Sequence, residues 1–94
     1  MQEKLSDVGA ERAVLSGLLQ YGIDAYINIS DIISQDSFAH YNNKLLYRCV
    51  EHIIEQDQTP DVATLLAAAE SLGVSENITT KQELAYIKAL YDFP

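Results

Sequence analysis

Three residues of this chain carry side chains that often bind metal ions or act as nucleophiles, namely His40, Cys49 and His52. Cys49 and His52 are three positions apart, so on a helix their side chains would lie one turn apart on the same side. A metal site needs more ligands than this pair supplies. We interpret Cys49 as a core residue and His52 as a surface residue, and we expect no metal site.

Two pairs of carboxylates are spaced for acid–base chemistry, Glu51 with Glu55 and Asp57 with Asp61. Such chemistry requires an apolar cleft that separates the pKa values of the two groups. The chain has 14 acidic and 6 basic residues, so pairs of this kind arise by chance on a solvated face. We therefore expect no catalytic site.

Nucleotide hydrolysis would require a glycine-rich loop that surrounds the phosphates, together with a lysine. The chain has four glycines, and none of them lies in a Gly-x-x-x-x-Gly-Lys setting. The net charge of -8 repels phosphate, and the aromatic residues are not interleaved with basic ones as base stacking would require. We expect no ATP hydrolysis, no cofactor and no direct binding of nucleic acid.

The composition is that of one globular domain. With 94 residues the chain can form a single modest core, and 48% hydrophobic residues are too many for a disordered segment. No apolar run approaches the ~20 residues that cross a bilayer. The single cysteine and a start without a signal peptide lead us to expect a cytoplasmic protein with no membrane contact.

The apolar periodicity predicts an all-α fold, a compact bundle of about five short helices in one domain covering residues 1–94. Five residues mark the helix ends: Asp7, Asp61 and Thr80 as N-caps, and Gly22 and Gly73 as C-terminal stops. The predicted helices are Val8–Tyr21, Asp24–Ser34, Asn42–Gln56, Val62–Leu72 and a last one from the Thr80 cap to about Tyr91.

The segment Asp24–Ser34 is the ambiguous one, because its isoleucines and tyrosine also suit a strand. We favour a helix, since no second β-rich segment exists to pair with. Gln35–Tyr41 is predicted to be a turn anchored by Phe38, and Val74–Thr79 is predicted to be a loop.

Tyr86 has an unusual position in the last predicted helix. Leu84, Ile87 and Tyr91 form the predicted inner stripe, and the spacing turns Tyr86 away from it. Exposed tyrosines are enriched at protein interfaces. We therefore predict that Tyr86 is a partner-binding residue.

Several short motifs follow one another along the chain. Residues 11–19, ERAVLSGLL, resemble the opening E-x-A-V-L-G-x-L-L of the N-terminal domain of DnaB-type replicative helicases. Residues 36–38, DSF, 44–47, KLLY, 59–65, TPDVATL, and 84–87, LAYI, match later features in the same order. The resemblance extends from Asp7 to Pro94. Asn42-Asn43 and Lys81-Gln82 depart from the family pattern, which has a Pro-His pair and a diglycine at these positions.

The resemblance implies the globular head of the helicase N-terminal collar, which lacks the helical hairpin and the RecA-type motor that follow it in the family. Such a head is a non-catalytic interaction domain. It would help to assemble the hexameric ring through self-association, and it would dock the primase C-terminal domain or a helicase loader in the primosome during DNA replication. Two alternatives are the helicase-binding domain of a primase and a stand-alone acidic adaptor from a phage.

The resemblance also implies which residues meet the partner. In the family, the tyrosine of L-A-Y-L and an acid that opens the first helix face primase, and they correspond to Tyr86 and Gly9 here. Because Gly9 has no charge, we expect Glu11 to supply it. The predicted partner-binding residues are thus Tyr86, Glu11 and Gly9.

Overall fold

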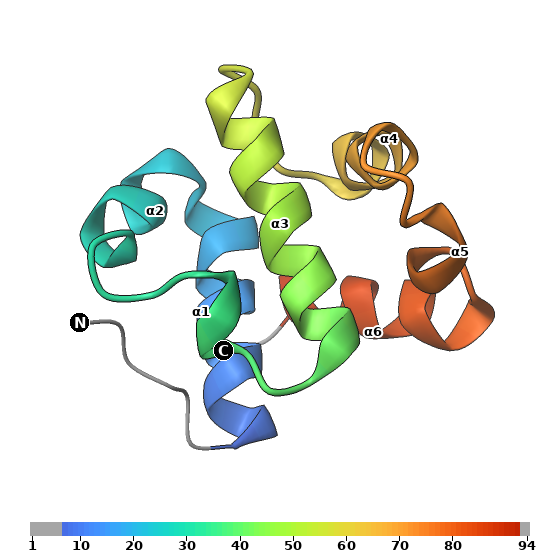
Figure 1. Ribbon diagram of the computed structural model, residues 1–94, viewed down its shortest axis with the longest axis horizontal. Helices are drawn as coiled ribbons and strands as arrows, with labels where there is room; N and C mark the ends of the chain where they lie inside the picture. Colours follow the sequence, from blue (N-terminus) through green and yellow to red (C-terminus); the bar gives the residue numbers. More distant parts are fainter. Residues whose placement is uncertain (1–6, 93–94) are drawn as a thin grey trace.

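The computed structural model describes residues 7–92 and shows an all-α fold (Figure 1). The first helix, α1, spans Val8–Tyr21, as predicted. The Asp7 side chain accepts a hydrogen bond from the backbone N–H of Ala10 at 2.7 Å and so caps the helix. Gly22 ends it with a φ of 60°, a conformation that glycine adopts without strain.

The second helix is shorter than predicted. Helix α2 spans Ile23–Ile29, and the chain then turns into a short 3-10 helix, η1, at Gln35–Ser37. Ser34 caps η1 by accepting a hydrogen bond from Asp36 N–H, and the Ser37 hydroxyl accepts one from Ser34 N–H. Helix α2 ends at Ile29, whose carbonyl accepts hydrogen bonds from the N–H groups of Ile32 and Ile33 in the turn that follows. The turn lets Ile33 and Phe38 enter the core.

Helix α3, Tyr41–Glu55, is the central helix and packs against α1, η1 and α4. Its boundaries lie one residue from the predicted ones. The Tyr47 ring lies 5.1 Å from that of Phe38, measured between centroids, and its hydroxyl donates to the carbonyl of Ile33 at 3.0 Å. The turn before α3 is therefore anchored to the middle of the helix.

Helix α4 spans Val62–Ser71, so it begins at the predicted residue and ends one residue earlier than predicted. Asp61 accepts a hydrogen bond from Thr64 N–H at 2.8 Å, and Gly73 has a φ of 75° just beyond the helix. The loop predicted at Val74–Thr79 is wrong. Residues Ser75–Ile78 form a short helix, α5, which buries Ile78 completely.

The last helix, α6, spans Lys81–Tyr91 and begins at Thr80, whose hydroxyl accepts a hydrogen bond from Glu83 N–H. Its two fully buried residues are Ile87 and Leu90. The Leu84 and Tyr91 side chains of the predicted stripe are only partly buried. The Ser16 hydroxyl of α1 donates to the carbonyl of Leu90 at 2.6 Å, which joins the first helix to the last.

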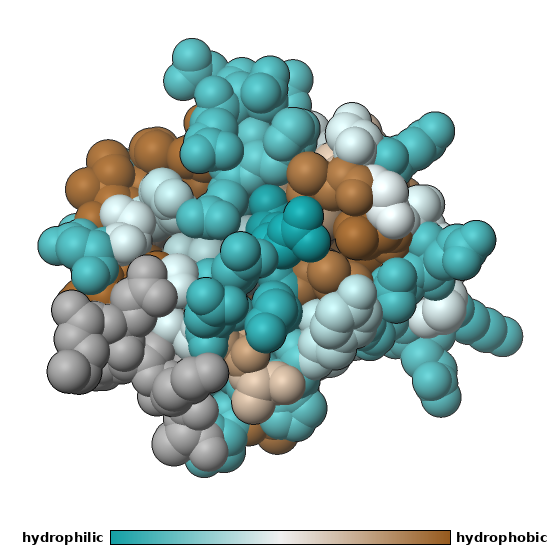
Figure 2. Space-filling view, viewed as in Figure 1, coloured by the Kyte–Doolittle hydropathy of each residue, from teal (hydrophilic) through white to brown (hydrophobic). Residues whose placement is uncertain are grey.

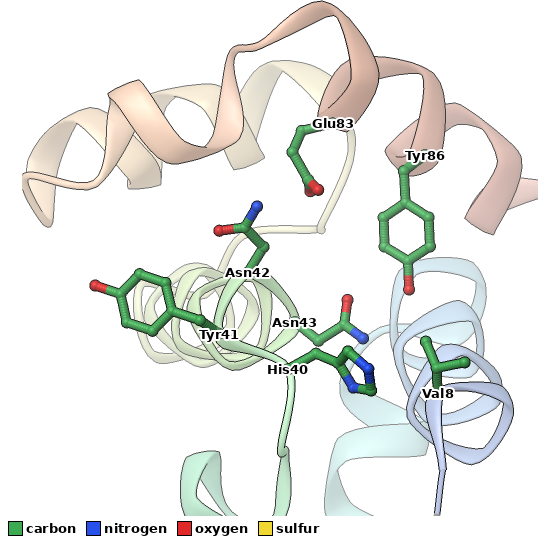
Figure 3. Close-up of a pocket in the computed structure, with 7 residues that line it drawn as sticks. All are labelled: Val8, His40, Tyr41, Asn42, Asn43, Glu83 and Tyr86. Atoms are coloured by element: carbon green, nitrogen blue, oxygen red, sulfur yellow. The ribbon is translucent and has the colours of Figure 1, made fainter.

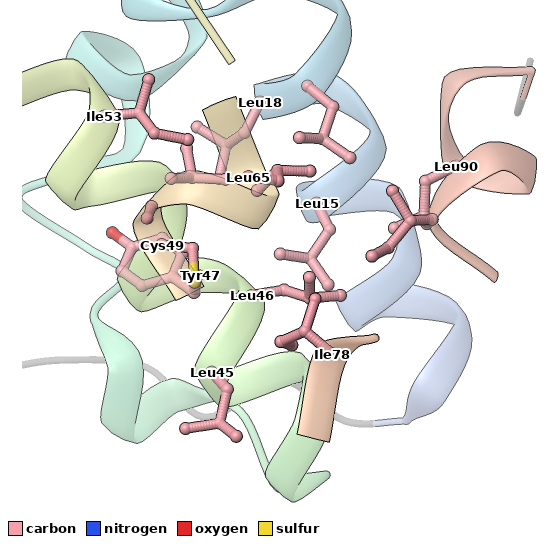
Figure 4. Packing of buried hydrophobic residues seen from close by; sticks show 14 of the residues in the cluster. Leu15, Leu18, Leu45, Leu46, Tyr47, Cys49, Ile53, Leu65, Ile78 and Leu90 are labelled. Carbon is pink, nitrogen blue, oxygen red and sulfur yellow. The ribbon is translucent and has the colours of Figure 1, made fainter. Parts of the chain in front are cut away.

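Side chains of α1, α3, α4, α5 and α6 form one core, against which partly buried residues of α2 pack (Figure 4). Leu15 and Leu18 of α1 meet Leu46 and Ile53 of α3, and each of the four is at most 1% exposed. The described residues contain six α-helices, one more than predicted, because of α5. No helix within residues 7–92 has the length and apolar character of a bilayer span.

Candidate functional site

A groove of about 470 Å³ lies where the starts of three helices meet (Figure 3). Helix α1 contributes the first wall, the start of α3 the second, and the first turns of α6 the third. The groove is lined by both aromatic and polar side chains: Val8, His40, Tyr41, Asn42, Asn43, Glu83 and Tyr86.

Two of these side chains give the groove an exposed apolar rim. Val8 is 51% exposed and Tyr41 is 63% exposed. Tyr86 extends from α6 toward Asn43 and Val8, while Tyr41 points away on the other side of the α3 start. Exposed apolar side chains next to polar groups are found in protein-binding surfaces.

Tyr86 lies in this groove, but it is less exposed than predicted. Its ring packs partly against the core, and the Arg12 guanidinium lies 5.9 Å from the ring centroid. Its hydroxyl is shielded from solvent and forms no hydrogen bond to another described group. Burial raises the pKa of this hydroxyl, and the nearby Asn43 and Arg12 partly oppose the change. Tyr86 is less exposed than predicted because it is adjacent to Ile87, and the buried stripe of α6 is wide enough to include the edge of the Tyr86 ring.

Glu11 is not on the surface as predicted, because its side chain is completely buried. One carboxylate oxygen accepts a hydrogen bond from Ala39 N–H at 2.8 Å. The other accepts from the side-chain amide of Asn43 at 3.0 Å and, more weakly, from His40 N–H at 3.4 Å. The His40 ring nitrogen Nδ1 lies 3.2 Å from the same oxygen and must carry a proton to donate to it.

Glu11 thus caps the start of α3 from a neighbouring helix. His40 occupies the N-cap position of α3 and makes no capping hydrogen bond with its own side chain. The negative charge of Glu11 also suits the positive end of the helix. Desolvation would raise the pKa of Glu11, but the hydrogen bonds from Asn43, Ala39 and His40 outweigh it and lower the pKa. These contacts hold the α3 wall of the groove in place.

Gly9 is exposed on the first turn of α1 and does not line the groove. A Cβ atom at this position would lie 3.2 Å from the Asp7 carboxylate that caps the helix. A larger residue here would therefore crowd the cap. Of the three predicted partner-binding residues, the structure places Tyr86 in the groove, Glu11 beneath it and Gly9 beside it.

The carboxylates Glu51 and Glu55 belong to a different part of the molecule. Tyr26 of α2 donates a hydrogen bond to Glu51 at 3.0 Å. Burial raises the pKa of Glu51, and burial beside Glu51 raises the pKa of Tyr26 to about 12. This contact connects α2 to α3 and does not form an acid–base pair between two carboxylates.

Cys49 is enclosed by the core, and we expect its thiol to react slowly in the folded chain. Burial raises the pKa of the thiol to about 11, although Arg48 partly opposes this. The reactive thiolate is therefore scarce at pH 8. Modification by a coloured disulfide reagent should be at least about 100-fold slower in buffer than in urea, because the thiol must first be exposed by unfolding. Equal rates in the two solutions would contradict this prediction.

Within residues 7–92, no three His, Cys, Asp or Glu side chains are grouped so that they could hold a metal ion. The fold and the groove together define a small all-α domain with aromatic and polar side chains at the meeting point of three helices.

The family model of the DnaB-like helicase N terminal domain matches residues 3–92, and the chain belongs to this family. The family domain is a non-catalytic helical domain, and these 94 residues contain no ATPase domain. No curated protein and no solved structure is significantly similar to the chain.

Six of the lining residues were not predicted from the sequence: Val8, His40, Tyr41, Asn42, Asn43 and Glu83. The one signal that they share is a position at the start of a helix, namely α1, α3 or α6. Only Tyr41 has a local signal of its own, an aromatic side chain on the polar side of α3.

Proposed function

We propose that the groove between α1, α3 and α6 docks a partner protein of a replicative helicase, the primase C-terminal domain or a helicase loader. The observation that supports this most directly is the exposed apolar rim of Val8 and Tyr41 beside the half-buried ring of Tyr86. Large apolar side chains at the edge of a groove give contact area to a partner, and aromatic ones contribute most to binding energy. The domain would act in the primosome, in the cytoplasm.

The charge and the family suggest two further parts of this proposal. A net charge of -8 disfavours direct contact with DNA, so the domain would act through proteins. Self-association in the hexameric ring of a parent helicase would place several copies of the groove around one collar. Several grooves on one ring would increase the avidity for a partner with more than one binding segment.

Tyr41→Ala should weaken binding of the isolated primase C-terminal domain, or of the loader, by roughly 1–3 kcal/mol, the usual range for an interface anchor. The side chain is 63% exposed, so the free energy of unfolding should change by no more than about 0.5 kcal/mol. Calorimetric titration with each partner in turn measures the first quantity, and urea denaturation measures the second.

Glu70→Ala is a control, because Glu70 is exposed on α4 and lies outside both the groove and α2. It should leave the affinity for both partners unchanged. Tyr86→Ala is a less clear test, since it also removes a ring that packs on the core and beside Arg12. If Tyr41→Ala and Val8→Ser both bind each partner as tightly as the native chain does, the groove is not the docking site.

A further inference from the structure

The exposed apolar side chains of this domain form two separate groups. Of the six large ones among the described residues, two are Val8 and Tyr41 at the groove. The other four lie within twelve consecutive residues: Tyr21 at 69% exposure, Ile23 at 51%, Ile27 at 62% and Ile32 at 45%. We call this second group the α2 patch. Figure 2 shows apolar surface at the upper left, where Figure 1 places α2.

Helix α2 buries little of its side-chain surface against the rest of the fold. None of its seven residues is fully buried, and the side chains that touch the core, those of Ala25, Tyr26 and Ile29, are only partly covered. Ile23 and Ile27 are four positions apart, so they share one face of the helix. That face has no partner within the described chain.

A small groove adjoins the patch. It has a volume of about 180 Å³, and its lining includes Tyr21, Gly22, Ile23 and Pro60. A second helix could pack against the row of side chains on α2. It could also insert one of its side chains into the small groove.

The charge around the patch is negative. Residues 13–43 contain three acids, Asp24, Asp31 and Asp36, all exposed, and no lysine or arginine. Two further acids, Glu51 and Glu55, lie on α3 close to Tyr26 of α2, whose hydroxyl donates a hydrogen bond to Glu51. A partner that covers the isoleucines would therefore meet carboxylates at the edge of its contact.

We propose that the α2 patch binds an amphipathic helix of another protein, with an apolar face on Ile23 and Ile27 and lysine or arginine along its flanks. A second copy of this chain fits less well. In a symmetric contact the acidic residues around the patch of both copies would come together, and each copy has a net charge of -8. A basic amphipathic helix would cover the apolar face and would also place cations beside the carboxylates.

The probe is a synthetic peptide with leucines at helical spacing and lysines on the remaining positions, titrated into the native 94-residue chain. A second peptide of the same composition has its residues scrambled so that no apolar face forms. The native chain should bind the first peptide at least about tenfold more tightly than the second, and added salt should weaken the complex. Amide chemical shifts should change around residues 21–32.

The double variant Ile23→Ser, Ile27→Ser should lose at least about tenfold in affinity for the amphipathic peptide, because both side chains of the contact face are removed. The matched control Tyr41→Ala removes an exposed apolar side chain at the groove and should change the affinity less than about threefold. Both positions of the double variant are exposed, and an unchanged thermal melt confirms that the variant is folded.

Four outcomes would overturn the proposal. Equal affinity for the two peptides would show that net charge alone attracts the probe. Chemical shifts confined to the groove at Val8 and Tyr41, or native affinity in the folded double variant, would place the binding elsewhere. A dimer of the native chain in sedimentation that the double variant abolishes would identify a second copy as the occupant.

Discussion

Replacing Glu11 by alanine should lower the free energy of unfolding by about 3 kcal/mol, a large part of the total for a domain of this size. The substitution leaves the N–H groups of Ala39 and His40 and the Asn43 amide without their acceptor. These are the contacts by which Glu11 caps the central helix. Urea denaturation followed by circular dichroism measures the change.

Glu55→Ala is the matched control for this substitution, because Glu55 is an exposed glutamate on the same central helix. Its free energy of unfolding should stay within about 0.5 kcal/mol of the native value. If Glu11→Ala were as stable as Glu55→Ala, the carboxylate would not be the cap that holds α3.

The same carboxylate should make the native chain sensitive to acid. The pKa of Glu11 is lower in the folded chain than its ordinary value of about 4.5, so the folded state binds the proton less well than the unfolded state does. The stability from Glu11 is complete above this ordinary pKa and is lost as the pH falls through the folded pKa. The native chain should therefore lose stability more steeply below about pH 4.5 than Glu11→Gln does, and parallel pH curves would contradict this.

Ile78→Ala should also cost about 3 kcal/mol, although Ile78 lies in a segment that its sequence marks as a polar loop. The side chain is 0% exposed, so the truncation removes buried methyl groups and leaves a cavity between α5 and its neighbours. Ile27→Ala deletes the same groups at a site that is 62% exposed and should cost much less. Equal midpoints for the two variants in urea would show that α5 does not contribute to the core.

Local signals made most of the fold predictable. Asp7, Asp61 and Thr80 cap the helices that the sequence places after them, because an N-cap acts on N–H groups only two or three residues away. Gly22 and Gly73 both adopt the positive φ that ends a helix. Such interactions need no knowledge of the rest of the chain.

The errors occurred where distant contacts decide the structure. Glutamate is usually found on the surface. The burial of Glu11 is explained only by its hydrogen bonds with Ala39, His40 and Asn43, which are distant in sequence. In the same way Ile78 folds as part of a helix because the core accepts its side chain. The groove was predicted only in part, through Tyr86, since its other walls come from helix starts that are far apart in sequence.

The bond between Ser16 and the carbonyl of Leu90 has a consequence for the order in which the chain folds during synthesis. Among the described helices of this domain, α1 leaves the ribosome before the others, yet one of its sides packs against α6, which emerges after the other five. Until then that side of α1 stays open to solvent or to a chaperone, even if α3 and α4 have already packed on the others. The nascent domain should therefore become resistant to protease only when residue 90 has cleared the exit tunnel.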